Sequence, residues 1–492
     1  MEAVTEKPKT RVGVALKPVL RRSDLRALQH RLKAGYDSAQ TTEHNRRHWA
    51  QADGLSADSA ANADVRRTLR NRARYEVANN SYARGIVLTL ANDTIGTGPR
   101  LQMLTDDPEV NRQVETEFHL WAQVVSLAMK LRTMRMARSQ DGEAFAMLAN
   151  NPRVDHAVKM DTILVEADQV TSGLRNSWDD QEIDGILLDG YGNPVSYRVL
   201  KYHPGGTRSF SYDTFMTVPA ESMIHVFRAD RPGQHRGIPE ITPALPLFAQ
   251  LRRFTLAVLA AAEAAADFAG ILYTDAPANG EADNVEPMDL IELERNMLLT
   301  MPGGWKMAQV EPMQPATTYA EFKREILNEI ARCLNMPYNI AAGNSSGYNY
   351  ASGRLDHQTY FKSIRVDQAY MANRILDRIL SAWLREYAVE SGILGLLGPL
   401  PAHQWFWDGM EHVDPQKEAN AQETRLKNHT TTLAIEYARQ GRDWENELRQ
   451  RAKEVTLMKE LGLTLAEAAP NAKPVTDPAT QKQEETDDGE ME

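Results

Sequence analysis

Hydrophobic residues recur at two different periods along this chain, and the change of period separates helical stretches from a strand-rich one. In the helical stretches apolar side chains return every third or fourth residue, which places them on one helix face. Helices are predicted on this basis over 65–91, 109–136, 241–270, 318–335, 352–390 and 443–461. In the longest of them Ile364, Met371, Ile375 and Trp383 share one face. The chain is therefore predicted to be mostly helical.

A strand-rich stretch lies between the second and third of these helices, where the period becomes two. The segments with this alternation are EAFAML, TILVEA, DGILLD, VSYRVL and MIHVFR. Gly and Pro in DGYGNP, at 189–194, predict a hairpin turn between two of them. Another turn, TIGTGP, is predicted to lead into a strand near Gln102. We therefore expect an α+β fold, predominantly helical, with a mixed domain over 62–240.

A short module at 272–317 separates two long predicted helices, 241–271 and 318–335. It contains a predicted short helix at 288–296 and a hairpin at 297–310. Because so short a module cannot bury a core of its own, it is predicted to be an insertion between the helices. The alanine-rich end of the first helix is interrupted by Glu263 and Asp267, so we interpret it as a packed helix and not as a membrane span.

Composition and charge narrow the class of protein. The 492 residues are 42% hydrophobic, which is enough for about three globular domains. Cys333 is the sole cysteine, which rules out an intrachain disulfide and favours a reducing compartment. The basic start of the chain has no continuous apolar core and is not interpreted as a secretory signal.

The formal net charge of -11 argues against a protein whose task is to grip nucleic acid, because that affinity comes mainly from Lys and Arg. Arginines are nevertheless frequent before residue 75, and the chain ends in EETDDGEME. We interpret these charge runs as solvated faces or chain ends. A basic arm is predicted over 1–61 and an acidic disordered tail over 471–492.

The loop GNSSG raises the question of catalysis, since it matches the G-x-S-x-G pattern that would make Ser345 an activated nucleophile. A nucleophile elbow needs a buried strand before the serine, whereas a helix and Pro337 come before this one. The chain has no phosphate-binding G-x-x-x-x-G-K-[ST] motif. No catalysis is predicted, although a serine hydrolase that uses Ser345 stays open as an alternative.

Two other clusters contain residue types that can form sites. His44 and His48 are four residues apart, but no third ligand lies nearby in the sequence. Asp141 and Glu143 flank a turn, and a carboxylate pair could act in acid–base chemistry. We interpret them instead as a turn Asp-Gly followed by a solvated Glu. Neither a metal nor a cofactor is predicted.

Four segments together resemble one known family, the portal proteins of tailed bacteriophages in their lambda-like branch. They are RARYEVANNSYARGIVLTLANDTIGTGPRLQ, RSQDGEAFAML, HVFRADRPGQHRGIPEITPAL and FKREILNEIARCLNMPYNIAAGNSSGYNYASGRLDHQTYF. Each segment alone is weakly diagnostic, but their order and spacing are specific. The resemblance covers about 65–465.

This resemblance implies a structural protein of the virion, assembled in the host cytoplasm. It implies a homo-oligomeric ring, dodecameric in virions, at one capsid vertex, with an axial tunnel for double-stranded DNA. The implied partners are the terminase large subunit, head-completion or adaptor proteins, and the major capsid and scaffolding proteins, without a membrane. The expected parts are a wing (62–240), a stem (241–271 and 318–335), a clip (272–317), a tunnel loop (336–351), a tunnel helix (352–390) and a helical crown (391–470).

A loop at the narrowest point of a conduit should touch DNA without holding it, since fixed lysines would bind phosphates in a salt-dependent way. The loop offers short neutral groups for such contacts, namely Asn344, Ser345, Ser346, Tyr348, Asn349 and Tyr350. The cations expected nearest to DNA are Arg354, Arg252 and Arg253. In the clip, Met301, Trp305 and Met307 are expected to dock partner proteins. Two alternatives stay open, an ordinary mobile connector at this loop and a host DNA-binding protein.

Overall fold

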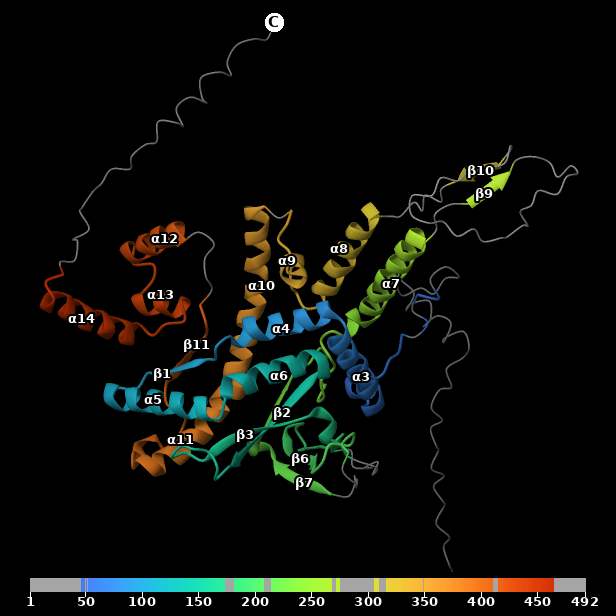
Figure 1. The fold of residues 1–492 in the computed structure, drawn as a ribbon. Coiled ribbons are helices and arrows are strands. Elements are labelled where there is room, and N and C mark those ends of the chain that lie inside the picture. The colour runs from blue at the N-terminus through green and yellow to red at the C-terminus, as the bar shows by residue number, and fades with distance from the viewer. Residues whose placement is uncertain are drawn as a thin grey trace, which may run out of the picture. The chain divides into compact units, whose positions relative to one another are not determined.

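A computed structural model describes most of the chain. The described residues are 46–48, 50, 52–172, 181–207, 214–267, 271–274, 305–308, 316–347, 349–409 and 415–463. The chain forms two compact units, Met1–Ala60 and Ala61–Glu492. In the first unit the described residues include one short helix, α2 (Ala57–Ala60). All elements discussed below belong to the second unit (Figure 1).

Helices dominate the second unit and strands fill its middle, as an α+β fold requires. The helices are α3 (Ala63–Asn79), α4 (Ser81–Ile95), α5 (Pro108–Val124), α6 (Leu127–Asp141), α7 (Leu245–Asp267), α8 (Ala316–Arg332), α9 (Tyr338–Ala342), α10 (Tyr350–Met371), α11 (Asp377–Ser391), α12 (Pro415–Lys427), α13 (Leu433–Arg439) and α14 (Trp444–Glu460). A π-helical turn, η5 (Ala372–Leu376), joins α10 to α11. The predicted fold class is thus confirmed.

Two of the predicted long helices are each two helices. Asn80 ends α3 and also caps α4, because its side chain accepts hydrogen bonds from the amides of Tyr82 and Ala83. The second break falls at Ser126, which has φ 53° and separates α5 from α6. The apolar period runs through both breaks, so the period alone could not show them.

Within the described residues the strands form four sheets. They are β1 (Arg100–Met103), β2 (Glu143–Asn150), β3 (Met160–Val165), β4 (Glu182–Ile183), β5 (Ile186–Leu188), β6 (Pro194–Leu200), β7 (Phe215–Pro219), β8 (Met223–Phe227), β9 (Ile271–Thr274), β10 (Trp305–Ala308) and β11 (His403–Phe406). The orders are β3-β2-β8, β4-β5-β6-β7, β1-β11 and β10-β9, and every pairing is antiparallel.

All five predicted strands and the strand near Gln102 are present, and the predicted hairpin joins β5 to β6. The strands β4, β7, β9 and β11 were not predicted. In particular, β11 pairs with β1 across three hundred residues, with Phe406 opposite Arg100. The segment predicted as a purely helical crown therefore also supplies a strand.

The larger apolar core lies between the β3-β2-β8 sheet, helices α5 and α6, and the helix α11. Trp121 and Trp383 are completely buried there, with Phe118 between them at ring distances of 5.3 Å to each. The apolar face predicted for the longest helix is confirmed, since each of its residues is at most 4% exposed. These residues are Ile364, Met371, Ile375, Ile379, Trp383 and Tyr387. Residues well beyond 240 thus complete the core of the region expected to be a wing (Figure 1).

A second core joins α3 and α4 to the start of α7, to α8 and to the first half of α10. Phe248 and Ile330 are buried in it. Farther along α7 the apolar side chains emerge, and Leu256 and Leu259 are 61% and 54% exposed. Among described residues, Thr242–Glu263 is the one helix whose length and hydropathy would allow a membrane crossing, which by itself is weak support for a span.

The predicted insertion between α7 and α8 is described only in part. Its strands β9 and β10 pair with each other, with Trp305 opposite Thr274. The predicted helix at 288–296 and the first strand of the predicted hairpin at 297–310 lie outside the described residues.

Candidate functional site

The polar loop between α9 and α10 is shorter than predicted. Its expected start, 336–342, contains the helix α9, and its expected end, 350–351, is the beginning of α10. The remaining residues from Gly343 to Gly347, together with Asn349, are exposed. Asn349 caps α10 by accepting a hydrogen bond from the amide of Ser352 at 2.8 Å.

Three of the predicted contact residues lie together on this exposed loop, namely Asn344, Ser345 and Ser346. Asn344 shapes it, because its side-chain oxygen accepts a hydrogen bond from the amide of Ser346 at 2.9 Å. Tyr348 and the side chain of Tyr350 lie outside the described residues. Ser345 follows a short helix and not a strand, so the setting that a nucleophile elbow requires is absent from this described segment.

Two hydrogen bonds fix the base of the loop. The side-chain nitrogen Nδ2 of Asn339 in α9 lies 3.0 Å from Nε2 of His357 in α10. One turn further on, Tyr360 donates to the carboxylate of Asp93 in α4 at 2.7 Å. Burial raises the pKa of Asp93, which Tyr360 and His357 partly offset. The loop therefore projects from a base that is tied to both neighbouring helices.

The three predicted cations differ in their surroundings. Arg354 is exposed near the start of α10, and Arg253 is exposed on α7. Arg252 forms a bidentate ion pair with Glu76 of α3, at 2.9 and 3.0 Å, and lies over the ring of Tyr75. Arg252 thus joins α7 to α3, and its charge is already balanced within the chain.

Glu143, interpreted above as solvated, is completely buried and lies at the centre of an ionic cluster. Arg236 binds its carboxylate with two nitrogens, Nε at 2.9 Å and Nη2 at 2.6 Å, and Arg70 adds a contact at 3.2 Å. His225, stacked between Phe145 and Phe227, lies 3.1 Å away. Although burial favours the neutral acid, Arg236 and the hydrogen bonds hold the pKa of Glu143 well below its usual range.

The basic run before residue 75 is likewise not a solvated face throughout. Arg66 and Arg70 are 2% and 4% exposed, and their partners include Asp184, Glu143 and Asp168. Arg74 binds Asp141 at 2.6 Å. These ion pairs hold α3 against the start of β2 and the segments that contain Asp168 and Asp184. Since each carboxylate is already held by guanidinium groups, the cluster has the features of a structural network and not of an acid–base pair.

A second buried cluster joins residues that the expected architecture assigns to two parts, the wing (62–240) and the tunnel helix (352–390). Glu240, just before α7, binds Arg135 at 2.8 Å and Arg138 at 2.9 Å, both on α6. Asp367 of α10 binds the same two arginines. Burial alone would raise the pKa of Glu240, but the two arginines outweigh it and lower that pKa to about 2.

Among the described residues, one group could hold a metal by geometry: Glu166, Asp168 and His203. Arg70 and Arg74 both bind Asp168, at 2.7 and 2.8 Å. Two guanidinium groups at a carboxylate oppose a bound cation, so the group is not a convincing metal site.

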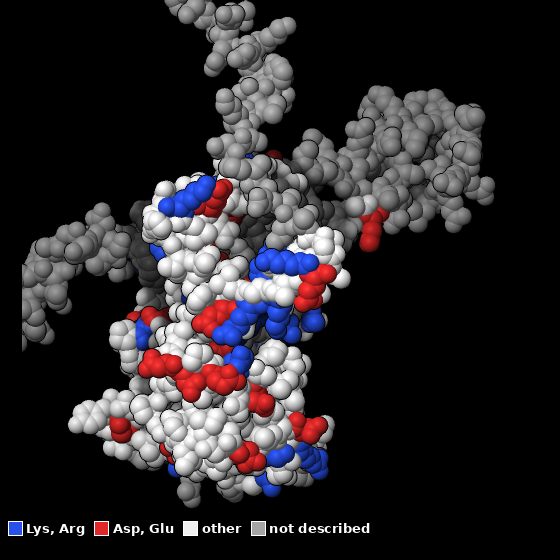
Figure 2. All heavy atoms as spheres, turned by 90° about the vertical axis from the view of Figure 1, so that its left-hand side faces the viewer, with Lys and Arg blue, Asp and Glu red and all other residues white. Residues whose placement is uncertain are grey.

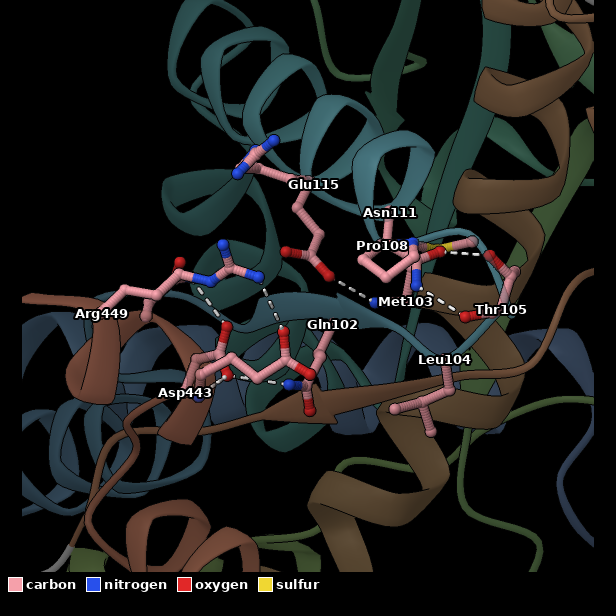
Figure 3. A pocket seen from close by; sticks show the side chains of 12 residues that line it. Gln102, Met103, Leu104, Thr105, Pro108, Asn111, Glu115, Asp443 and Arg449 are labelled. Carbon is pink, nitrogen blue, oxygen red and sulfur yellow. Dashed lines mark hydrogen bonds and ion pairs between the residues drawn. The ribbon is translucent and has the colours of Figure 1, made fainter.

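A polar groove of about 240 Å³ lies between β1, α5 and the start of α14 (Figure 3). Glu115 points into it and accepts a hydrogen bond from the amide of Met103 at 2.7 Å. Asp443, the cap of α14, binds Gln102 at 2.8 Å on the other side. Burial, and then the charges of Asp443 and Glu445, raise the pKa of Glu115 to about 7.

The surface on this side of the molecule carries both signs of charge. Figure 2 shows acidic and basic side chains in adjacent groups, with no field of a single sign across the face. An interspersed surface of this kind gives solubility and does not suggest a nucleic-acid groove on this face.

Comparisons with known proteins agree with the sequence resemblance. The family model described as "Phage portal protein, lambda family" matches residues 43–368, more than half of the chain. A probable portal protein of Halomonas phage phiHAP-1 is 24% identical over 437 residues, covering 80% of this chain and 81% of that protein.

Solved structures give weaker matches. The neck of an empty gene transfer agent particle contains a chain that is 14% identical, with a TM-score of 0.43, over 79% of this chain and 94% of that one. An HK97-family phage portal protein from Corynebacterium diphtheriae is also 14% identical, with a TM-score of 0.29, over 59% of this chain and 85% of that one. Similarities at this level do not add to the argument.

The family match defines a structural protein of the phage particle. The chain belongs to the lambda family of phage portal proteins. The family points to a non-enzymatic role.

Proposed function

We propose that this protein forms a homo-oligomeric ring of about twelve subunits at one capsid vertex and conducts double-stranded DNA through its axial tunnel. The family match over 43–368 is the observation that carries this proposal. The ring admits DNA during packaging and releases it during ejection. It acts by passive guidance, since the sequence has no phosphate-binding loop that would supply ATP hydrolysis.

We propose that the loop between α9 and α10 contacts the passing duplex. Asn344, Ser345 and Ser346 are exposed together at its tip, and their side chains are short and neutral. Neutral groups exchange hydrogen bonds with phosphate oxygens without the counterion release that makes cationic contacts tight. Arg354, exposed beside the loop, is the nearest cation that would add attraction.

We further propose that the insertion between α7 and α8 docks the terminase large subunit during packaging and head-completion or adaptor proteins afterwards. Trp305 and Met307 lie in its strand β10, and Met301 lies outside the described residues. An insertion between two long helices can project from the rest of the subunit toward a partner. Aromatic and Met residues are enriched at protein–protein interfaces. Contacts with the major capsid and scaffolding proteins complete this proposal.

Native mass spectrometry together with negative-stain microscopy of the purified protein tests the proposed ring. The expected result is a ring of about twelve subunits with a central hole. A monomer or dimer at every salt and protein concentration would overturn the proposal. In that case an esterase assay of the wild type and Ser345→Ala would test the hydrolase alternative directly.

A further inference from the structure

The buried cluster around Glu240 is balanced in charge and almost closed to solvent. It contains two guanidinium groups, of Arg135 and Arg138, and two carboxylates, of Glu240 and Asp367. At its rim a third guanidinium group, of Arg228, lies 3.8 Å from Glu240, and Asp230 balances its charge at 2.8 Å. The side chains of the two arginines and Glu240 are at most 5% exposed, and that of Asp367 is 20% exposed. Asp367 accepts two hydrogen bonds from Arg138 Nη2, at 2.7 and 2.8 Å, and its distance to Arg135 is 2.9 Å.

These four residues come from three separate elements. Both arginines lie on α6, which packs in the larger core, while Glu240 lies two residues before the short helix Thr242–Ala244 that leads into α7. Asp367 lies in the last turns of α10, before the π-helical turn. The cluster therefore ties the beginning of α7 and the end of α10 to the same two side chains of α6.

Asp367 also marks a change in how the long helix is held. Beyond it, α11 is packed in the core, with Ile379, Leu380 and Trp383 fully buried. Before it, the described side chains of α10 are mostly exposed, and only Tyr360 and Ile364 are buried. Tyr360 and Ile364 are thus the buried apolar contacts of the half of the helix that carries the loop, beside the hydrogen bonds of His357 and Tyr360.

We propose that Asp367 is a positioning residue that sets the direction of α10, and with it the position of the loop 343–349, relative to the start of α7. This inference rests on the proposed ring, because loop position matters for a tunnel. If α10 swung away, two buried arginines would be left with one carboxylate, which is strongly unfavourable in a low dielectric. The charge balance therefore favours one orientation of α10 over others.

Two neighbouring contacts support the same role. Gln368 donates a hydrogen bond to the carbonyl of Thr94 at 3.2 Å. Tyr370 donates to the carbonyl of Phe227 at 2.9 Å, and its ring lies near the Arg138 guanidinium, at 5.7 Å. Asp367, Gln368 and Tyr370 therefore hold this point of the helix from several sides.

Hydrogen–deuterium exchange of assembled rings tests this inference. In Asp367→Asn we expect amide exchange of 350–366 to be faster by at least about tenfold, while 377–391 is unchanged. The control is Asp356→Asn, the same change about three turns earlier on the same helix and outside the cluster. It should leave both segments at the wild-type rate.

A charge-balanced double variant separates positioning from simple stability. Arg138→Met with Asp367→Leu leaves Arg135 paired with Glu240, so the thermal midpoint should return close to that of the wild type. A positioning role predicts that exchange in 350–366 nevertheless stays fast. If exchange returns to the wild-type rate together with the midpoint, or if Asp367→Asn shows no change, the inference is wrong.

The outcomes for assembly keep this inference distinct from the proposed function. If the wild type forms no rings, the ring proposal itself fails. If the wild type forms rings but Asp367→Asn does not, exchange is compared between the wild type and the double variant only. The charges of the double variant are balanced, so its exchange rate in 350–366 decides whether Asp367 positions α10.

Discussion

Arg236 and Glu143 meet in a bidentate ion pair from which solvent is excluded, with side chains 1% and 0% exposed. Ninety-three residues separate them in the sequence. Arg236 also donates to the carbonyl of Val170 at 3.1 Å. The pair therefore holds the loop after β8 against the start of β2 and the segment after β3.

Replacing Glu143 with Gln should be strongly destabilising. The change removes the one carboxylate shared by Arg236 and Arg70. Each of these buried arginines then keeps one other carboxylate, Asp184 for Arg236 and Asp168 for Arg70. Breaking a buried ion pair on one side typically costs about 3–5 kcal/mol of unfolding free energy. Chemical denaturation of the purified protein measures the loss.

Glu109→Gln is the matched control for this prediction. Glu109 undergoes the same chemical change but is 77% exposed, in an ion pair with Arg112 on the surface of α5. Its effect should stay within about 0.5 kcal/mol. Equal effects of the two substitutions would show that the Glu143 cluster does not hold this region together.

Gly142 gives a second prediction about stability. Its φ is 91°, and a Cβ there would lie 2.5 Å from the carbonyl carbon of Ile238 and 2.7 Å from the nitrogen of Pro239. Gly142→Ala should therefore cost more than about 2 kcal/mol, from backbone strain and from a clash with backbone that cannot move aside.

Gly85 is the opposite case, because it lies inside α4 and nothing lies within 4 Å of an added Cβ. Gly85→Ala should stabilise the protein by about 0.5–1 kcal/mol. Thermal unfolding of both variants beside the wild type tests the pair. A loss for Gly85→Ala as large as that for Gly142→Ala would contradict the local account of both glycines.

Periodic apolar residues were a reliable guide to the helices and to five strands of this fold. Ile375 and Trp383, predicted to share a face, are completely buried. The apolar period did not predict helix ends at polar residues that leave the period intact. Asn80 is such a residue, because it ends α3 and caps α4. The period also gave no sign of β11, because the partner of that strand is far away in the sequence.

The buried ionic clusters were missed for a different reason. Charged residues are mostly on the surface, so Arg66, Arg70 and Glu143 were interpreted as solvated. One signal was present in the sequence: Arg66, Arg70 and Arg74 are four apart and so share a helix face, beside Ala73 and Val77. The partners of these arginines could not be found from the pattern, since they come from distant segments.

The groove near α14 predicts a dependence of stability on pH. Because the pKa of Glu115 is raised to about 7 in the folded protein, the folded state holds its proton more tightly than the unfolded state. The contribution of Glu115 to stability therefore falls as pH rises from about 4.5 to about 7. Above that window the carboxylate is charged beside Asp443 and Glu445.

Glu115→Gln should remove this dependence while keeping an acceptor for the Met103 amide. We expect the variant to have a higher thermal midpoint than the wild type at pH 8, by about 1–2 °C, and the same midpoint at pH 4.5. Differential scanning calorimetry at the two pH values measures the difference. A gain of equal size at both would mean that proton binding by Glu115 is not its cause.

The neutral loop between α9 and α10 leads to a prediction about DNA. If it touches the duplex as proposed, Ser345→Lys should add a phosphate contact in each subunit that reaches DNA. The ring should then bind short duplex DNA more tightly, and the slope of log affinity against log salt should steepen by about 0.9 for each new contact.

Tyr191→Lys adds the same charge at the tip of the β5–β6 hairpin, where Tyr191 is 95% exposed. Fluorescence anisotropy over a salt series compares both variants with the wild type. If only Ser345→Lys steepens the slope, DNA reaches the loop, and the short neutral side chains there are what allow it to slide. If both variants behave alike, general charge explains the binding, and the loop is an ordinary connector between two helices.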